Sequence, residues 1–184
     1  MQAVILAGGK GTRLRPYTTV LPKPLMPIGD MPVLEVVLRQ LRRAGFTRVT
    51  MAVSYLAELI EAFCGDGSRF GLSIAYSREE QELSTAGPLK LIRGLDETFL
   101  VMNGDLLTTL DYAALLRRHK EQGAAATIAA HRRTVKIDYG VIEPGPDGTL
   151  GDYIEKPEFG YMVSMGVNVL EPSAIELIGE NEKL

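Results

Sequence analysis

The sequence predicts an α/β fold, in the form of a Rossmann-like three-layer α/β/α arrangement with a mostly parallel central sheet. Apolar runs typical of buried strands alternate with segments of helical periodicity over the first two-thirds of the chain. Alternation in units of this size favours parallel strands joined by right-handed crossovers. In the last third, short turns rich in proline and glycine separate the strands, which predicts antiparallel additions to the sheet.

The first part of the chain supplies most of this alternation. Its first helix should bury one face, because apolar residues recur there at helical spacing, as Leu34, Val37, Leu38 and Leu41. In order, the pattern predicts a strand at 3–6, a helix at 32–44, a strand at 48–54, a helix at 56–64, a strand at 72–76, a helix capped by Ser84 or Thr85 that runs to about residue 95, and a strand at 99–103.

The second part begins with a helix that Asp111 should cap. His119 lies among charged residues on this helix and is expected at the surface. His131 ends the next strand beside two arginines, so it is a candidate anion contact. Neither histidine has a partner that would make a nucleophilic triad, and covalent catalysis is not expected. The predicted elements are a helix at 112–122, strands at 125–130, 139–142, 150–156 and 162–170, and a helix at 172–178.

Composition and charge exclude several classes of protein. The chain has 184 residues, 46% of them hydrophobic, which fits one globular domain with a core. A net charge of −3 gives no general attraction to nucleic acid. Cys64 is the single cysteine, so there is no internal disulfide and no cysteine-based metal site. The sequence shows neither a secretion signal nor an apolar run of membrane length, so we expect a cytoplasmic protein without a membrane partner.

A glycine-rich segment at residues 6–27 is the strongest candidate for a binding site. Gly8, Gly9 and Gly11 directly follow the first strand, where the backbone must turn sharply or let a ligand approach. Arg13 and Lys23 come next, in a stretch that four prolines stiffen. Exposed backbone N–H groups together with two fixed cations predict a site for polyphosphate.

The spacing of this segment differs from that of two familiar phosphate loops. No Gly-Lys-Ser/Thr follows a glycine at the distance that the Walker A motif requires. Gly9 and Gly11 lead to Leu14, where the dinucleotide fingerprint would have its third glycine. The alternative is a tight structural turn with incidental charges, but such a turn seldom needs this composition over so many residues.

The apolar strand at 99–103 points to a second part of the same site. It brings Asn103, Gly104 and Asp105 to its carboxyl end, where ligands of open α/β sheets bind. Bound polyphosphate calls for a hard oxygen ligand for Mg²⁺, and Asp105 is the candidate. The alternative is that this aspartate only begins a turn.

The glycine-rich segment resembles the signature of the nucleotide-sugar pyrophosphorylases, also called sugar-1-phosphate nucleotidyltransferases. That signature, G-G-x-G-T-R-L-x-P-x-T-x-x-x-P-K-P, is present without a gap from Gly8 to Pro24. The closest resemblance is to the mannose-1-phosphate guanylyltransferase and glucose-1-phosphate nucleotidyltransferase branch. It continues along the chain as N-G-D at residues 103–105 and E-K-P at residues 155–157.

This resemblance implies the nucleotide-diphospho-sugar transferase fold and a role for each matching residue. Ser84 replaces a glycine of the family's L-G-T-A-G pattern, which leaves the contact to the base open at that point. The implied catalytic residues are Arg13, Lys23 and Asp105, with Mg²⁺ on Asp105. The implied nucleotide contacts are Leu6, Ala7, Gly8, Gly9, Gly11, Thr12, Arg13, Gly87, Asn103 and Gly104. The implied sugar-phosphate contacts are Lys23, Gly140, Glu155, Lys156 and Asn168.

The implied reaction joins a nucleoside triphosphate to a sugar 1-phosphate and releases pyrophosphate, with Mg²⁺, by direct in-line attack. One alternative is a nucleotide-sensing or regulatory subunit that keeps the fold without turnover. Another is a cytidylyltransferase that acts on an alcohol phosphate, and the E-K-P motif argues against it. Neither the base nor the sugar can be read from the sequence, which also leaves a homo-oligomer open.

The resemblance also bears on the length of the chain. Family members continue beyond the last predicted helix and supply a second metal-binding aspartate from there. The sequence is therefore expected to form a single nucleotidyltransferase domain at residues 1–184 without its C-terminal part.

Overall fold

The computed structural model describes residues 1–79, 83 and 86–179. The chain forms two compact units, a first unit of Met1–Ile128 with Gly166–Leu184 and a second unit of Ala129–Met165. Two long strands, β7 (Ala126–Lys136) and β10 (Glu158–Leu170), each begin in one unit and end in the other.

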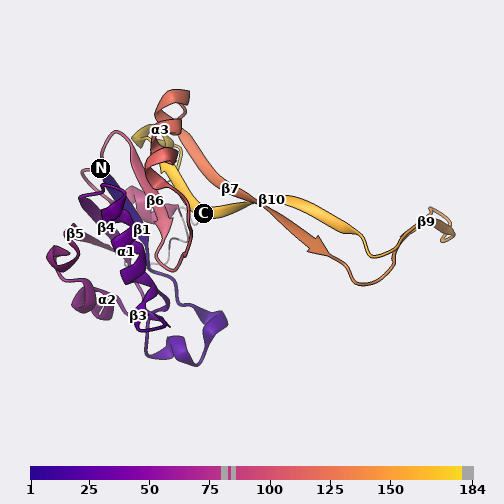
Figure 1. The fold of residues 1–184 in the computed structure, drawn as a ribbon, viewed down its shortest axis with the longest axis horizontal. Coiled ribbons are helices and arrows are strands. Elements are labelled where there is room, and N and C mark those ends of the chain that lie inside the picture. Colours follow the sequence, from indigo (N-terminus) through magenta and orange to yellow (C-terminus); the bar gives the residue numbers. More distant parts are fainter. Residues whose placement is uncertain (80–82, 84–85, 180–184) are drawn as a thin grey trace. The chain divides into compact units, whose positions relative to one another are not determined.

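The first unit contains a mostly parallel sheet, as predicted. Its strands β1 (Gln2–Leu6), β4 (Arg48–Val53), β5 (Ser73–Arg78) and β6 (Phe99–Asn103) run parallel in the order β5-β4-β1-β6. Figure 1 shows β4, β1 and β6 side by side. Residues 167–170 of β10 pair antiparallel with β6. The predicted fold class, α/β with a mostly parallel sheet and antiparallel additions, is confirmed.

Burial on both faces explains why this sheet is stable. Ala3, Val4 and Ile5 are all fully buried although alternate residues of a strand point to opposite faces. Helix α1 (Val33–Arg43) buries its predicted apolar stripe completely, since Leu34, Val37, Leu38 and Leu41 have no exposed surface. Helix α2 (Ala57–Cys64) ends at Gly65, as its pattern predicts. A short hairpin of β2 (Pro27–Ile28) and β3 (Met31–Pro32) leads into α1.

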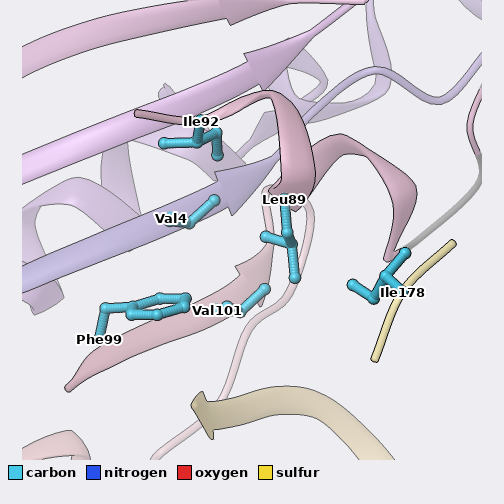
Figure 2. Packing of buried hydrophobic residues seen from close by; sticks show 6 residues of the cluster. All are labelled: Val4, Leu89, Ile92, Phe99, Val101 and Ile178. Carbon is cyan, nitrogen blue, oxygen red and sulfur yellow. The ribbon is translucent and has the colours of Figure 1, made fainter. Parts of the chain in front are cut away.

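One hydrophobic cluster joins the sheet to two segments far apart in the sequence. Figure 2 shows Leu89, from the 3-10 turn η5 (Gly87–Leu91), beside Val101 of β6 and Ile178. Ile178 comes after the last helix, α4 (Pro172–Glu176), and the Lys90 ammonium donates to its carbonyl oxygen. The full cluster is Val4, Leu89, Ile92, Phe99, Val101 and Ile178.

The helix predicted from residue 84 to about 95 is wrong in type and extent. Its candidate caps, Ser84 and Thr85, lie outside the described residues. The chain forms only the five-residue η5 in this region and becomes extended at Ile92 (φ −82°, ψ 125°). This extension lets both Leu89 and Ile92 reach the same cluster, so tertiary packing overrides local helix propensity.

The surface position expected for His119 is wrong. Helix α3 (Tyr112–Gln122) is capped by Asp111, which accepts from Ala114 N–H at 2.9 Å, as predicted. His119 is only 1% exposed because it lies seven residues after buried Tyr112 on the same helical face. Its ring nitrogens contact Thr127 Oγ1 at 2.8 Å and Glu171 Oε1 at 3.0 Å, so this buried polar ring is satisfied by hydrogen bonds.

The second unit is antiparallel, as the sequence predicts. Strands β8 (Val141–Pro144) and β9 (Leu150–Ile154) pair antiparallel, and every residue of β9 is exposed. Strands β7 and β10 are longer than predicted, so His131 lies inside β7 and does not end it. Lys136 forms an ion pair with Glu158 at 2.5 Å.

Within the described part of the chain, none of the helices has both the length and the apolar character needed to cross a lipid bilayer.

Candidate functional site

A pocket of about 530 Å³ lies in the first unit at the carboxyl ends of β1, β5 and β6. Its volume is within the range of pockets that bind ligands of nucleotide size. Its position agrees with the general rule that open parallel sheets bind ligands beyond the carboxyl ends of their strands. It is lined by Leu6, Ala7, Gly8, Gly9, Gly11, Thr12, Arg13, Leu14, Lys23, Pro24, Glu79, Pro88, Asn103 and Asp105.

The glycine-rich segment forms the largest part of this lining. Gly11 has φ +58°, a left-handed conformation, and begins the 3-10 turn η1 (Thr12–Leu14) that carries Arg13. The buried Thr18 hydroxyl donates to the Gly11 carbonyl at 2.9 Å and holds this bend in place. A Cβ on Gly9 would meet nothing within 4 Å, so the main chain there is open to a ligand.

Lys23 is positioned by its neighbours in the sequence. It begins the 3-10 turn η3 (Lys23–Leu25), after an extended Pro22, and both Pro24 and Leu25 are buried. The turn is therefore anchored by packing, while the side chain of Lys23 stays 44% exposed. Its ammonium forms an ion pair with the carboxylate of Asp105.

Asp105 is held near the glycine-rich segment by the backbone of its neighbour. Gly104 N–H donates to the Leu6 carbonyl at 2.9 Å, which ties the ends of β6 and β1 together. A Cβ on Gly104 would lie 3.1 Å from Ile5 Cγ2 and 3.4 Å from Pro24 Cγ. The missing side chain at Gly104 therefore permits the close approach that brings Asp105 to Lys23.

Sequence reasoning missed Glu79 in the pocket. Its backbone N–H donates to the Val53 carbonyl at 3.0 Å, directly after β5 ends, and its Oε2 accepts from Leu83 N–H at 3.3 Å. Its other carboxylate oxygen lies 2.9 Å from the position of a Cβ on Gly8. The signal that could have found it is the one that indicated Asp105, a carboxylate at the carboxyl end of a parallel strand.

Some residues that the resemblance implied lie outside the pocket lining. Gly87 is buried next to Pro88, which does line it, and Gly104 lies between Asn103 and Asp105 in the chain. Asn168 is paired with Val101 across β10 and β6. Gly166, two residues before it, passes close to the pocket residue Asn103, because a Cβ there would be 2.6 Å from Asn103 Nδ2.

The remaining implied residues, Gly140, Glu155 and Lys156, belong to the second unit, where Gly140 and Glu155 lie beside Tyr153 and Lys156 lies beside Glu155. The Tyr153 hydroxyl donates to Glu155 Oε2 at 2.8 Å. A Cβ on Gly140 would overlap this hydroxyl, at 2.1 Å. Lys156 has the positive φ of +45°, and its ammonium lies 3.9 Å from Glu155 Oε1. Both charged side chains are exposed.

The described residues offer neither a closed metal site nor an activated thiol. Among residues 1–79, 83 and 86–179, no three His, Cys, Asp or Glu side chains gather where they could hold a metal ion. Burial raises the pKa of the Cys64 thiol to about 12, so this residue is not a thiolate nucleophile at neutral pH. Glu79 and Asp105 are the carboxylates among the residues that line the pocket.

Comparison with known proteins identifies the relatives of this chain. The family model described as Nucleotidyl transferase matches residues 2–184. A UTP–glucose-1-phosphate uridylyltransferase from Synechocystis sp. is 38% identical, over 100% of this chain and 52% of its own length. A mannose-1-phosphate guanyltransferase from Candida albicans is 39% identical, over 97% of this chain and 52% of its own. The chain thus spans about half the length of the curated relatives it matches.

Solved structures give the same picture of the fold. The crystal structure of HddC from Yersinia pseudotuberculosis superposes with a TM-score of 0.74 at 25% identity, covering 98% of this chain and 81% of HddC. HddC complexed with GMP-PN superposes with a TM-score of 0.72 over the same shares. A putative glucose-1-phosphate thymidylyltransferase from Bacillus anthracis, at 22% identity, has a TM-score of 0.77 and shows the fold alone, covering 100% of this chain and 79% of its own.

Proposed function

The chain belongs to the nucleotidyl transferase family, and we propose that the protein joins a nucleoside triphosphate to a sugar 1-phosphate, releasing pyrophosphate. One observation carries this proposal. A single pocket is lined by the open glycine backbone, by Arg13 and Lys23, and by the Asp105 carboxylate. Cations and backbone N–H groups suit a polyphosphate, while the carboxylate suits the cation that accompanies it.

The triphosphate is bound by the glycine-rich segment. Backbone N–H groups between Gly8 and Thr12 face its oxygen atoms, and the open space above Gly9 lets the phosphate chain lie against the main chain. Arg13 holds the two phosphates that depart as pyrophosphate. Its guanidinium can donate two parallel hydrogen bonds to such a group.

The chemical step is in-line attack by an oxygen of the sugar phosphate on the α-phosphorus. The new P–O bond forms on one side while the bond to pyrophosphate breaks on the other. The attacking oxygen is already anionic at neutral pH, so no side chain has to remove a proton from it. The residues of the site therefore act by positioning and by charge stabilisation, with Lys23 at the oxygen atoms that gain charge.

Asp105 is the side chain that would hold Mg²⁺. Its carboxylate is 25% exposed at the pocket, offers hard oxygen atoms, and already attracts the ammonium of Lys23. When bound, Mg²⁺ would neutralise charge on the triphosphate. Asp105 itself supplies the fixed anchor at the end of β6, beside the glycine-rich segment.

Glu79 favours guanine as the base. A carboxylate only accepts hydrogen bonds; Oε2 of Glu79 accepts from Leu83 N–H, and Oε1 lies beside Gly8 at the pocket. Guanine presents two adjacent donors, N1–H and N2–H, whereas uracil and thymine flank their N3–H with two carbonyl oxygens that repel a carboxylate. Glu79→Gln removes one acceptor and adds a donor. We expect it to lower the preference for GTP over UTP by roughly tenfold, measured as the ratio of kcat/KM.

The deciding experiment measures pyrophosphate release with four nucleoside triphosphates against mannose 1-phosphate, glucose 1-phosphate and an alcohol phosphate. Release that needs both a triphosphate and a sugar 1-phosphate is the expected result. Binding of nucleotide without release in any combination would favour a nucleotide-sensing subunit instead. Release with the alcohol phosphate alone would favour a cytidylyltransferase-like activity.

A further inference from the structure

The two charged residues assigned to different ligands contact each other directly. The Lys23 ammonium forms an ion pair with Asp105 Oδ2. The proposed function assigns Lys23 to phosphate oxygen atoms and Asp105 to a divalent cation. In this ion pair, the ammonium supplies the positive charge that the divalent cation would bring to Asp105. The carboxylate supplies the negative charge that the phosphate would bring to Lys23.

This ion pair and a divalent cation compete for one carboxylate. A cation bound to Asp105 would lie within a few ångströms of the ammonium, and like charges at that distance repel strongly at the edge of a protein. An ammonium has no acceptor capacity, so it cannot bind the metal itself. Lys23 must leave Asp105 before a divalent cation can use the full capacity of that carboxylate.

The structure gives Lys23 the freedom to make this move. Its backbone is anchored, because Pro24 and Leu25 beside it are buried, while its side chain is 44% exposed on a flexible stem. Asp105 is less exposed, at 25%, and its neighbour Gly104 is bound to Leu6. The ammonium is thus the mobile member of the pair and the carboxylate is the fixed one.

We propose that Lys23 acts as a resident counter-ion of Asp105, and that nucleotide and metal enter the site by exchange. Phosphate oxygen atoms draw the ammonium away from Asp105, and the divalent cation then takes its place on the carboxylate. Each ligand thereby removes the obstacle to the other, so the two bind cooperatively and by the same factor in either order. This inference rests on the proposed function, because that function assigns the two ligands.

The exchange makes an unusual prediction for Lys23→Met, which removes the ammonium and keeps the length of the side chain. Without nucleotide, the variant should bind Mn²⁺ about two- to fivefold more tightly, because a partly exposed ion pair of this strength no longer competes. Without metal, in EDTA, it should bind nucleoside triphosphate at least about tenfold more weakly, since a charged hydrogen-bond donor is lost. A misfolded variant would lose affinity for both ligands.

The measurement is titration of Mn²⁺ into the chain, followed by electron paramagnetic resonance of the free ion. Arg13→Met is the matched control, because it removes one positive charge from the same pocket without vacating Asp105, and it should change Mn²⁺ affinity less than about twofold. Lys23→Arg keeps the charge and should bind Mn²⁺ within about twofold of the unsubstituted chain. In a chain that already carries Asp105→Asn, adding Lys23→Met should no longer raise the affinity for Mn²⁺.

The results separate failure of the exchange from failure of the proposed function. If Asp105→Asn weakens Mn²⁺ but Lys23→Met leaves its affinity unchanged or lower, the exchange is overturned while the assigned metal ligand stands. If Asp105→Asn leaves Mn²⁺ binding unchanged, Asp105 is not the metal ligand, and both the assignment and the exchange fall. If Arg13→Met raises the affinity for Mn²⁺ as much as Lys23→Met does, the effect comes from the general electrostatics of the pocket, and the exchange is overturned as well.

Discussion

Two lysines beside prolines, Lys23 in the first unit and Lys156 in the second, are held by different means. The turn that carries Lys23 is fixed by buried Pro24 and Leu25. Lys156 has an exposed side chain and the uncommon backbone φ of +45°, and the Pro157 that follows it is buried and accepts a hydrogen bond from Ile137 N–H at 3.1 Å. The first lysine is therefore placed by the core of the first unit, and the second by its own positive φ and by contacts within the second unit.

The difference extends to the units as a whole. Strand β1 of the first unit has Ala3, Val4 and Ile5 fully buried, while all of β9 in the second unit is exposed. Packed side chains resist displacement, whereas an exposed two-stranded hairpin gains little stability by itself. Pre-organisation, which lets a site stabilise the transition state, is thus a property of the first unit. The second unit is better suited to contribute binding contacts.

The largest expected effect separates the two lysines. Lys23→Ala should lower kcat for pyrophosphate release by about 10²–10³-fold, about 3–4 kcal/mol, because it removes a fixed cation from developing charge. Lys156→Ala should instead raise KM for the sugar 1-phosphate by roughly tenfold and leave kcat nearly unchanged. Steady-state kinetics with both substrates varied distinguishes these patterns. An equal loss of kcat in both variants would mean that the second unit is as pre-organised as the first.

A glycine in each unit tests the same contrast through stability. Gly11→Ala should destabilise the fold by about 1–3 kcal/mol, because φ is +58° and the new Cβ would lie 2.9 Å from Thr18 Cγ2. Gly140→Ala should cost less, since the Tyr153 side chain that it meets is exposed and can move. Gly9→Ala is the control with no expected cost, because nothing lies within 4 Å. Urea unfolding measures all three, and a larger loss at Gly140 than at Gly11 would contradict the comparison.

The smallest effect concerns two glutamates and depends on pH. The hydrogen bond from Thr98 lowers the pKa of Glu171, helped by the contact with His119. A carboxylate with a lowered pKa contributes stability that is present above its ordinary pKa of 4.5 and is lost as the pH falls through the folded value. Glu171→Gln should therefore cost roughly 1 kcal/mol at pH 7 and progressively less below its ordinary pKa.

Glu155→Gln is the matched substitution in the second unit. Glu155 also accepts a hydrogen bond, from Tyr153, but its side chain is exposed, so the free energy of unfolding should change by less than about 0.5 kcal/mol. Denaturant unfolding from about pH 3.5 to pH 7 compares both variants with the unsubstituted chain. A pH-independent loss in Glu171→Gln would show that packing at this position matters more than its charge.

Much of the fold could be predicted from the sequence because its strands and helices carry strong local patterns. The apolar run before Gly8 became β1, the stripe at Leu34 became the buried face of α1, and Asp111 capped α3. His119 was placed wrongly because its neighbours in the sequence are charged, although its spacing from Tyr112 indicates the buried face. The helix predicted at η5 was wrong because Leu89 and Ile92 pack in one cluster with Ile178, which lies too far along the chain for a local pattern to reveal it.

The candidate site divides in the same way. The glycine-rich segment was recognisable because its composition is unusual over a continuous stretch, and the structure gathers its glycines and both of its predicted cations around one pocket. Glu79 was missed because it lies in a run of charged residues, where a pocket carboxylate looks like any solvated one. The ion pair between Lys23 and Asp105 joins residues far apart in the sequence, and only the three-dimensional fold brings them into contact.

The hydrogen bond from Gly104 N–H to the Leu6 carbonyl has a consequence for how the site opens. A bonded amide exchanges its hydrogen for deuterium only when the bond breaks, so its exchange rate reports the opening of its surroundings. Here, opening separates the strand end that carries the glycine-rich segment from the one that carries Asp105. The rate of deuterium uptake at this one amide therefore reports how often the two strand ends separate. A ligand that contacts both of them should lower this rate.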